Sequence, residues 1–463
     1  MKYAGKVNPF SAPGLVAVLF VILLFGSMTL TILFPFLPKL VKSFGVSEVE
    51  IGFYAGIIGS SFYAGRSLCS ILWGYMVDWK GKKFTLILTL TTLTLSTIGF
   101  GLTRSFAWAF ITRFLQGCFL GLGVVIISYI SDICDDTNRP LGMTLVMSAC
   151  TTGIVIGQSL GAFLAFPVER YPKVFRKGSI FDQFVILLPN MVLAVCFVLM
   201  IVLAIYVLPP DKKVIKTERE TLLKDKDNAK IHCKGKDKQT FKNLVRNKNC
   251  LLSFLLYLTT GIVNNGFDEM FPVLAATTHE YGGFDFSPAN IGTTLLIMAF
   301  ATILVVTTVG TKILLCFGAK KMFIYCVLLQ SICFPILPLL SNLSNGALFW
   351  LLLMTLMTTI RLCSEETSIV MAVFMNNSVE NNVRGMANGL GITGSSLGRM
   401  IGPSLFGGLY SWSLTNKVGI EQNHHAIGFP FNQFFVFFLM SITGTLNAIM
   451  VTRFPDSINV MKK

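Results

Sequence analysis

The segment Gly74-Tyr75-Met76-Val77-Asp78-Trp79-Lys80-Gly81-Lys82-Lys83 lies between two long apolar runs, near residues 51–75 and 84–103. It consists of a glycine, an aspartate four residues later, a basic residue, a second glycine and two more basic residues. Asp78 falls at the C-terminal end of the first run, where the dipole of a helix disfavours an acid. Its carboxylate therefore needs a partner elsewhere, such as the N-terminus of another helix. The lysines alone are also typical of a short cytoplasmic turn after a membrane helix.

The composition indicates an integral membrane protein. Of the 463 residues, 53% are hydrophobic and only 13% are charged, and the mean hydropathy is +0.68. Soluble globular chains have about 25% charged residues. Apolar stretches of roughly 20 residues, the length that spans a bilayer, number about twelve by the hydropathy rule. They lie near residues 14–38, 51–75, 84–103, 106–130, 141–166, 184–208, 250–275, 290–310, 322–341, 347–374, 386–411 and 429–452.

The net charge of +15 is distributed as in a membrane protein and not as in a nucleic-acid-binding protein. With the N-terminus inside, 26 of the 38 Lys and Arg residues lie on the inner side and 8 on the outer side. The segment 209–249 holds 13 of the inner ones, and without it the inner side still leads by 13 to 8. This asymmetry predicts that both termini and the 209–249 loop are cytoplasmic. Whether the membrane is a plasma membrane or a vacuole-type membrane stays open.

Cysteine and histidine give no sign of a metal site or a cofactor. The 11 cysteines include no Cys-x-x-Cys pair, and the 4 histidines fall in predicted loops. We therefore expect no bound metal and no cofactor. The chain also has no histidine at membrane depth to activate a nucleophile, so we do not expect an enzyme. No phosphate-binding loop is present, and the driving force should come from ion or substrate gradients.

Two halves of the chain echo one another, which predicts a duplicated architecture. Two groups of residues recur, at offsets of 237 and 245. The pairs are Phe34-Pro35 with Phe271-Pro272, Gly81 with Gly318, Lys83 with Lys320, Asp135 with Glu380, Arg139 with Arg384, Gly153 with Gly398, and Gly157 with Gly402. Parallel repeats of six helices are a transporter architecture. The predicted fold is an all-α membrane protein with six-helix bundles at 1–208 and 250–463, joined by a cytoplasmic linker at 209–249.

Eight charged residues fall at membrane depth, where a lone charge costs at least about 2.5–3.5 kcal/mol on insertion scales. Each needs a partner or a wet cavity, so all are functional candidates. The acids are Asp268, Glu269, Glu365 and Glu366, and the bases are Arg66, Arg113, Arg361 and Arg399.

Helical geometry divides these acids into roles. Arg361 and Glu365 are four residues apart and face the same way, so they can form an ion pair, although such a pair can serve only to neutralise itself. Glu366 is turned about 100° from Glu365, and the same turn separates Asp268 from Glu269. A carboxyl group in an apolar cavity can exchange a proton near neutral pH, whereas one beside arginine stays ionised. Asp268 or Glu269 is the expected proton carrier, because their predicted helix holds no basic neighbour.

The segment 74–83 resembles the signature loop of the major facilitator superfamily. Its positions are occupied by Gly74, Asp78, Gly81, Lys82 and Lys83. The resemblance implies two six-helix bundles that rock about a central site. From the motif, and from the unfavourable position of Asp78 at a helix end, we hypothesise that Asp78 and Lys82 form a cytoplasmic latch between the bundles.

Arg113-Phe114-Leu115-Gln116-Gly117 resembles the second motif of the superfamily, an arginine followed by glutamine and glycine. In proton-coupled members that arginine is associated with coupling, which makes Arg113 and Gln116 candidates; the alternative is a structural clamp. Since Arg361 competes for Glu365, we expect Arg113 to contact Glu366 across the cavity in one access state. Arg66 either lines the cavity or pairs with an acid of the other half.

A row of small residues, Gly153, Gly157 and Gly161, has the spacing of the superfamily's antiporter motif, in which small side chains let helices approach closely. Gln158 and Ala162 depart from that motif, which has proline and glycine there, and this leaves the direction of transport open. A second row, Gly398, Gly402 and Pro403, lies in the other half. Packing alone is the alternative role of both rows.

Several segments resemble more narrowly the zinc-induced facilitator-like branch, which is similar to the drug:proton antiporter group. They are Ile51 to Gly56, Gly65 to Gly74, Tyr171 to Phe175, Ser179 to Phe181, Glu269 to Pro272, Gly282 to Phe284, and Arg384 to Gly389. The resemblance implies a proton-coupled exporter or a vacuolar-type sequestering carrier. Because the chain has no histidine-rich loop, an organic or chelated solute is favoured over a bare metal ion.

The expected function is therefore secondary active transport by alternating access, with antiport of a small solute against protons. A uniporter of the same fold and a non-transporting receptor or scaffold are the alternatives. Costly charges retained at membrane depth argue against the receptor or scaffold. The expected partners are the solute, the coupling proton and the lipid bilayer, and we expect a monomer.

Overall fold

The computed structural model describes residues 13–134, 139–208, 246–305, 318–344, 346–379, 384–421 and 428–455. These ranges are mostly helical and contain no strand. Asp135, Glu380 and most of the expected linker, residues 209–245, lie outside the described residues, and so do the side chains of Arg139 and Arg384.

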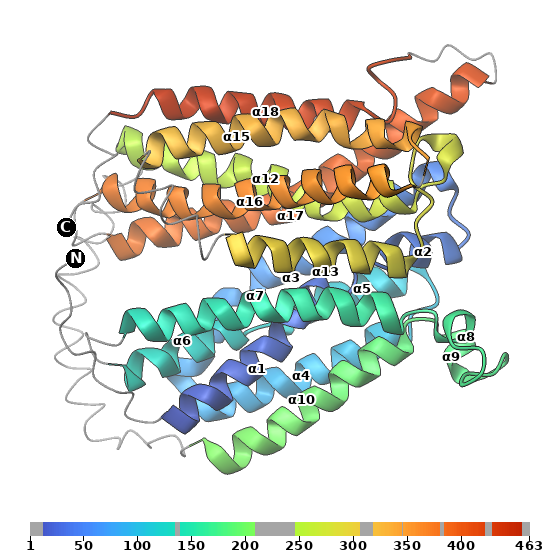
Figure 1. Ribbon diagram of the computed structural model, residues 1–463. Helices are drawn as coiled ribbons and strands as arrows, with labels where there is room; N and C mark the ends of the chain where they lie inside the picture. Colours follow the sequence, from blue (N-terminus) through green and yellow to red (C-terminus); the bar gives the residue numbers. More distant parts are fainter. Residues whose placement is uncertain are drawn as a thin grey trace, which may run out of the picture. The chain divides into compact units, whose positions relative to one another are not determined.

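Each of the twelve predicted stretches contains helix within the described residues, and the predicted all-α membrane fold is confirmed (Figure 1). In the described ranges, eight helical segments are long and apolar enough to cross a membrane. The longer helices are α1 (Pro13–Thr31), α3 (Ile51–Lys80), α4 (Lys82–Gly101), α5 (Phe106–Phe119), α6 (Leu122–Ile133), α7 (Arg139–Leu164), α10 (Leu187–Val207), α12 (Lys248–Ala276), α13 (Pro288–Val305), α15 (Ala319–Ile336), α16 (Ala347–Asn377), α17 (Arg384–Glu421) and α18 (Phe435–Thr452). The short elements are α2 (Leu37–Ser43), α8 (Pro167–Arg170), α9 (Ile180–Gln183), η1 (Glu48–Glu50), η2 (His279–Tyr281) and η4 (Leu337–Asn342).

Two predicted spans are broken, each for a visible reason. The stretch 14–38 divides into α1 and α2 around Pro35, which cannot donate a backbone hydrogen bond. The stretch 106–130 divides into α5 and α6 at residues 120–121. There the indole nitrogen of Trp73 donates to the carbonyl oxygen of Cys118 at 2.7 Å, and the Trp73 ring lies against Gly121. A side chain from α3 thus takes an acceptor that a continuous helix would use for its own ladder.

The chain divides into two compact units that do not follow the order of the sequence. One comprises Met1–Asp211, Gly266–Ala299 and Pro403–Phe435. The other comprises Lys212–Asn265, Phe300–Gly402 and Val436–Lys463. The second-half helices α12, α13 and α17 are divided between the two units, and α18 contributes only its first residue, Phe435, to the first unit. The first unit therefore contains parts of the second half beside helices of the first half.

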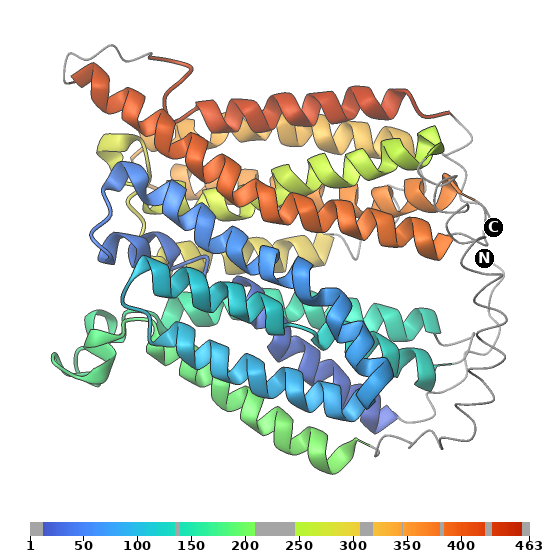
Figure 2. The ribbon, with the colours of Figure 1, turned by 180° about the vertical axis from the view of Figure 1, so that it is seen from behind.

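Glycines set the close helix packing of the first unit. Two glycines of the row in α7 lie against the backbone of α1, where Gly153 faces the Leu24 carbonyl and Gly157 the Met28 carbonyl. The third, Gly161, faces the carbonyl of Ile32, the residue that follows α1. The contact of α7 with α1 is among the most extensive in the unit, together with those of α3 with α5 and of α4 with α10. Helices α4 and α10 lie side by side in Figures 1 and 2.

The second unit uses the same device between α17 and α12. A Cβ at Gly398 would lie 2.7 Å from the Leu258 carbonyl oxygen and 2.8 Å from the Gly261 backbone. Gly402 is buried further along α17. In the first unit, the carbonyl of the next residue, Pro403, lies against Gly56 of α3. The packing role of the row 398–403 is thus visible at Gly398 and Pro403.

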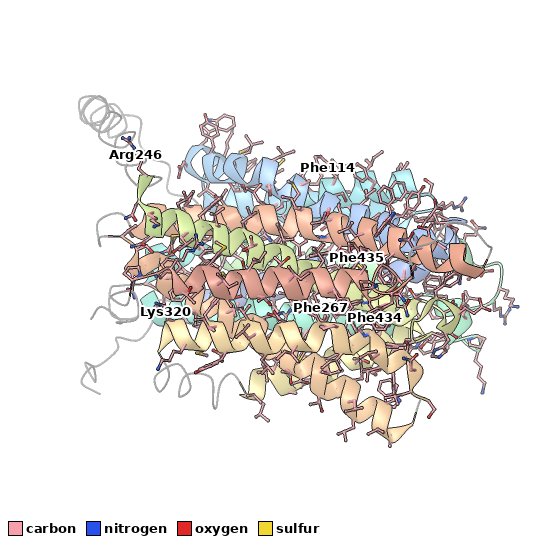
Figure 3. The ribbon with its side chains drawn as sticks, turned by 90° about the horizontal axis from the view of Figure 1, so that it is seen from above. Phe114, Arg246, Phe267, Lys320, Phe434 and Phe435 are labelled. Carbon is pink, nitrogen blue, oxygen red and sulfur yellow. The ribbon has the colours of Figure 1, made fainter. Side chains whose placement is uncertain are left out.

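The sequence repeat has a structural counterpart at its glycine and lysine positions. Gly81 and Gly318 directly precede α4 and α15 with φ of 96° and 77°, a conformation that favours glycine. The ammonium group of Lys83 donates to the carbonyls of Ile205 and Leu208, each at 2.7 Å. The ammonium group of Lys320, labelled in Figure 3, donates to the Phe454 carbonyl at 2.9 Å. Both lysines satisfy carbonyls at or just beyond the C-terminal end of the last helix of their half.

The packing of Gly161 generates a stability prediction. An alanine methyl at this position would overlap the Ile32 carbonyl oxygen. We expect Gly161→Ala to lose about 1–3 kcal/mol of stability, the usual cost of overpacking. The measurement is the thermal midpoint in fluorescence-detected size-exclusion chromatography. Gly123→Ala in α6 is the matched control, because no atom lies within 4 Å of its added Cβ. Equal midpoints for the two variants would contradict the prediction.

Candidate functional site

Glu269 is the most unusual charged residue of the described chain. Its side chain is only 2% exposed, and neither carboxylate oxygen has a hydrogen-bond partner among the described residues. The carboxylate lies directly against Gly59 of α3, within the same compact unit. Its neighbour Asp268 is half-buried and does interact with other groups. The two adjacent acids thus differ in burial and in their contacts, and the division of roles between them stays a prediction.

Arg113 is a buried cation fixed by groups of the first half. It is 1% exposed on α5. One terminal nitrogen donates to the Thr29 carbonyl at 3.1 Å and to the Gln116 side-chain oxygen at 2.9 Å. Gln116 in turn donates to the Thr97 hydroxyl at 3.2 Å. These contacts link α5 to α1 and α4, as the alternative role of Arg113 as a structural clamp would require.

Arg113 also makes contacts other than these hydrogen bonds. Its guanidinium lies over the rings of Phe62 and Phe100, at 4.6 and 5.4 Å from their centroids, an arrangement that stabilises a buried cation. Its Nε atom is buried and has no hydrogen-bond partner among the described residues. Arg113 and Glu269 also interact electrostatically. An arginine of the first half and an acid of the second half therefore share one buried environment.

Helix α16 carries the second group of predicted charges. Arg361 and Glu365 form the expected ion pair, with a nitrogen-to-oxygen distance of 3.0 Å. Their side chains are 24% and 39% exposed. Glu366 is only 7% exposed, so the two adjacent acids differ in exposure, in agreement with the helical turn of about 100° between them. These residues lie in the second unit and Arg113 in the first, so the contact between Arg113 and Glu366 stays a prediction.

An uncharged polar cluster in the second unit was missed by reasoning from charge. Gln330 of α15 is 3% exposed, and its amide nitrogen donates to Asn264 at 3.1 Å and to Ser364 at 3.0 Å. Between α12 and α18, the side chain of Asn447 accepts from the Thr259 hydroxyl at 2.7 Å. Amides at membrane depth, such as the Asn264-Asn265 pair in α12, were the available signal.

The segment 74–83 forms the end of α3 and the start of α4. Asp78 is exposed and has no hydrogen-bond or ion-pair partner among the residues that the structure describes. Lys82 donates to the Ser128 carbonyl of α6 at 2.8 Å and lies over the Tyr129 ring. Nothing lies within 4 Å of a Cβ built on Gly74. The latch between Asp78 and Lys82 stays a prediction.

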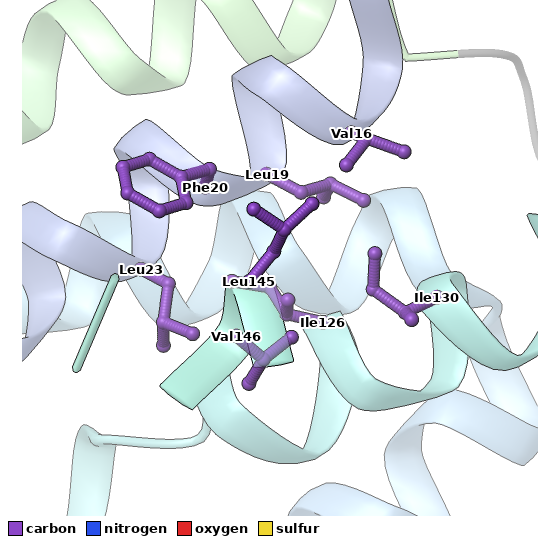
Figure 4. Close-up of a pocket in the computed structure, with 8 residues that line it drawn as sticks. All are labelled: Val16, Leu19, Phe20, Leu23, Ile126, Ile130, Leu145 and Val146. Atoms are coloured by element: carbon purple, nitrogen blue, oxygen red, sulfur yellow. The ribbon is translucent and has the colours of Figure 1, made fainter. Parts of the chain in front are cut away.

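The two remaining predicted bases and one cavity complete the survey. Arg66 and Arg399 are both half-buried, and Arg66 interacts with other groups. A small cavity between α1, α6 and α7 is lined only by apolar side chains (Figure 4), which are Val16, Leu19, Phe20, Leu23, Ile126, Ile130, Leu145 and Val146. It offers no polar group to a charged or hydrogen-bonding solute.

Membrane-length helices and charges at membrane depth together define a multi-pass membrane transport protein. The sequence matches the Major Facilitator Superfamily over residues 19–403, and the chain belongs to this family of secondary transporters, which are not enzymes.

Relatives and solved structures agree with this membership. Zinc induced facilitator-like 1 of Arabidopsis thaliana is 28% identical over 93% of this chain and 89% of its own length. A probable peptide/nitrate transporter of the same plant is 30% identical over 84% of this chain and 81% of its own. The resemblance to the zinc-induced facilitator-like branch is therefore confirmed. A crystal structure of a D-xylose–proton symporter has the same fold, with a TM-score of 0.68 and 15% identity over 96% of this chain and 98% of its own.

The ion pair on α16 can be tested by a double-mutant cycle. We expect Arg361→Gln and Glu365→Gln to couple by about 0.3–0.5 kcal/mol in stability, as for a partly exposed pair four residues apart. Because both side chains are accessible, we also expect all three variants to lose transport. Thermal midpoints and solute flux in vesicles are the measurements. Normal flux in the double variant would mean that the two charges only neutralise each other.

Proposed function

We propose that this protein is a proton-coupled antiporter of a small organic or chelated solute, working by alternating access. The observation that carries the proposal is the Glu269 carboxylate, buried without a hydrogen-bond partner among the described residues. A charge in such a place is costly unless a cation compensates it or a proton neutralises it. Glu269 can therefore exist in two forms whose energies depend on Arg113.

The electrostatic interaction between Glu269 and Arg113 supports a mechanism for coupling. When Glu269 is ionised, its attraction to Arg113 holds a second-half segment against first-half helices. When Glu269 is protonated, this attraction is lost, and the segment is released. A ligand that shifts the equilibrium between two conformations must bind them with different affinity. In the proposal, the proton binds Glu269 more weakly in the conformation in which Glu269 lies near Arg113.

The proton gradients across a membrane are large enough to drive transport of a solute against its own gradient. A proton gains about 2.3 kcal/mol per 100 mV of potential and about 1.4 kcal/mol per pH unit. In the proposal, the halves 1–208 and 250–463 move around the central site, and the segment 209–249 joins them in the cytoplasm. An Arg113 contact with Glu366 belongs to another access state.

The nature of the solute is supported by chemistry and by the relatives. The accessible pair Arg361 and Glu365 offers both signs of charge, and Gln330 and Asn264 add neutral hydrogen-bonding groups. Arg66 is a further candidate for the cavity. The relatives carry names that refer to zinc and to peptide or nitrate, and we infer an organic or chelated solute. We also propose a monomer with both termini in the cytoplasm.

The proposal is tested in reconstituted vesicles with an imposed pH gradient. Chelators, organic cations, organic anions and potassium are screened for accumulation. We expect one class of solute to accumulate inside the vesicles only when the interior is more acidic than the outside, so that protons leave as the solute enters. Flux that is indifferent to pH would identify a uniporter and overturn the antiport proposal.

Glu269→Gln should abolish accumulation but not exchange. A one-proton exchange driven by one pH unit supports about tenfold accumulation, and we expect this ratio to fall to about one in the variant. Counterflow of labelled solute should continue, because the neutral amide imitates the protonated acid. Asp268→Asn is the matched control on the neighbouring residue, and it should keep the pH-driven accumulation. If Glu269→Gln still concentrates the solute, the proton site lies elsewhere.

Asp78→Asn tests the proposed cytoplasmic latch. We expect the folded yield to be unchanged, because Asp78 is exposed, and the transport rate to fall by about tenfold or more, equivalent to about 1.4 kcal/mol in the barrier. Initial rates are compared at equal protein amounts. A well-expressed variant with a normal rate removes the latch from the mechanism.

A further inference from the structure

We propose that Gly59 is a positioning residue for the coupling acid: it leaves open the space that the Glu269 carboxylate occupies. This inference rests on the proposed function, because it concerns the same acid. Sequence reasoning did not single out Gly59, which lies in the first third of α3, fifteen residues before Gly74, the first glycine of the signature loop.

The geometry at Gly59 is a direct steric relation. A Cβ built on Gly59 would lie 2.5 Å from both the carboxyl carbon and one oxygen of Glu269, and closer still to the other oxygen. Real Cβ atoms essentially never approach another heavy atom within 3.0 Å. The carboxyl group thus takes the place that a side chain at residue 59 would need.

Two other glycines of the same helix have a different role. Gly52 and Gly56 lie against backbone atoms of α17, at Gly407 and Pro403. Those glycines permit helix packing, whereas Gly59 faces the end of an ionisable side chain. The three positions are spaced so that they share one face of α3, and only Gly59 meets a titratable group.

The absence of a side chain at Gly59 matters because the carboxylate has no other anchor. Neither oxygen has a hydrogen-bond partner among the described residues. The charged group that faces it from α5 is Arg113, which Tyr63 of α3 also influences, and Asp268 is its acidic neighbour on α12. Shape therefore sets the distance between Glu269 and Arg113. A methyl group at residue 59 would displace the carboxylate and change that interaction.

The experiment uses Gly59→Ala in the full-length protein, reconstituted with an imposed pH gradient. We expect the initial rate of pH-driven accumulation to fall by about tenfold or more, since overpacking by one methyl costs free energy of that order. We also expect the pH profile of solute exchange to shift, which a merely structural defect would not cause. Gly123→Ala is the control, since its Cβ meets no atom within 4 Å.

A compensating variant makes the test specific. Aspartate is one methylene shorter than glutamate, so Glu269→Asp withdraws the carboxyl group from Gly59. We expect the double variant Gly59→Ala/Glu269→Asp to transport better than either single variant. Such mutual rescue is a coupling that independent sites do not show.

The outcomes separate this inference from the proposed function. If Glu269→Gln retains accumulation, the proposed function fails. If Glu269→Gln loses accumulation while Gly59→Ala matches Gly123→Ala in both accumulation and pH profile, the inference alone is overturned. Should Gly59→Ala fold poorly, its folded yield is measured with Glu269→Asp and with Glu269→Ala. Recovery of the yield supports the steric relation, and failure of both to restore it overturns the inference.

Discussion

The buried carboxylate of Glu269 has no hydrogen-bond donor among the described residues, so its charge must be compensated in another way. This requirement constrains the packing of the first unit around it. Arg113 offsets its charge, but Arg113 is itself held by Thr29 and Gln116 of the first half. The cation is therefore fixed, and the acid belongs to a second-half helix. In the proposed mechanism, any displacement of Glu269 from Arg113 must be accompanied by a proton or by water, since a lone carboxylate at membrane depth is too costly.

Close helix packing supplies the rigid frame around this acid. The antiporter motif of the superfamily has glycine where Ala162 stands in this chain, yet the contact survives. A Cβ on Gly292 of α13 would overlap that of Ala162. Here the glycine at this contact is Gly292 on the neighbouring helix, and the backbones approach closely. The departure at Ala162 therefore does not by itself argue against the antiporter arrangement.

Sequence reasoning succeeded where the controlling physics is local. Hydropathy predicted the twelve stretches, and the spacing of four residues predicted the pair Arg361 and Glu365. It failed where a distant side chain decides: the division between α5 and α6 depends on Trp73, and the place of Glu269 against Gly59 depends on the packing of α12 on α3. The Gln330 cluster was not predicted, because the candidates were selected by charge and its amide and hydroxyl groups are neutral. The break at Pro35 was readable from the residue alone.

Glu365 and Glu269 differ in whether the energy of their interaction with arginine can depend on the conformation of the protein. Glu365 is paired with Arg361 on the same helix, so the pair moves as one body and its energy does not depend on how the halves are arranged. Glu269 interacts with an arginine more than 150 residues away in the chain, on a different helix. Only an interaction between different helices of the two halves, such as that of Glu269 with Arg113, can change when the halves move. Coupling between a proton and a conformation requires a difference in free energy between the two states, and Glu269 is the acid whose surroundings can provide one.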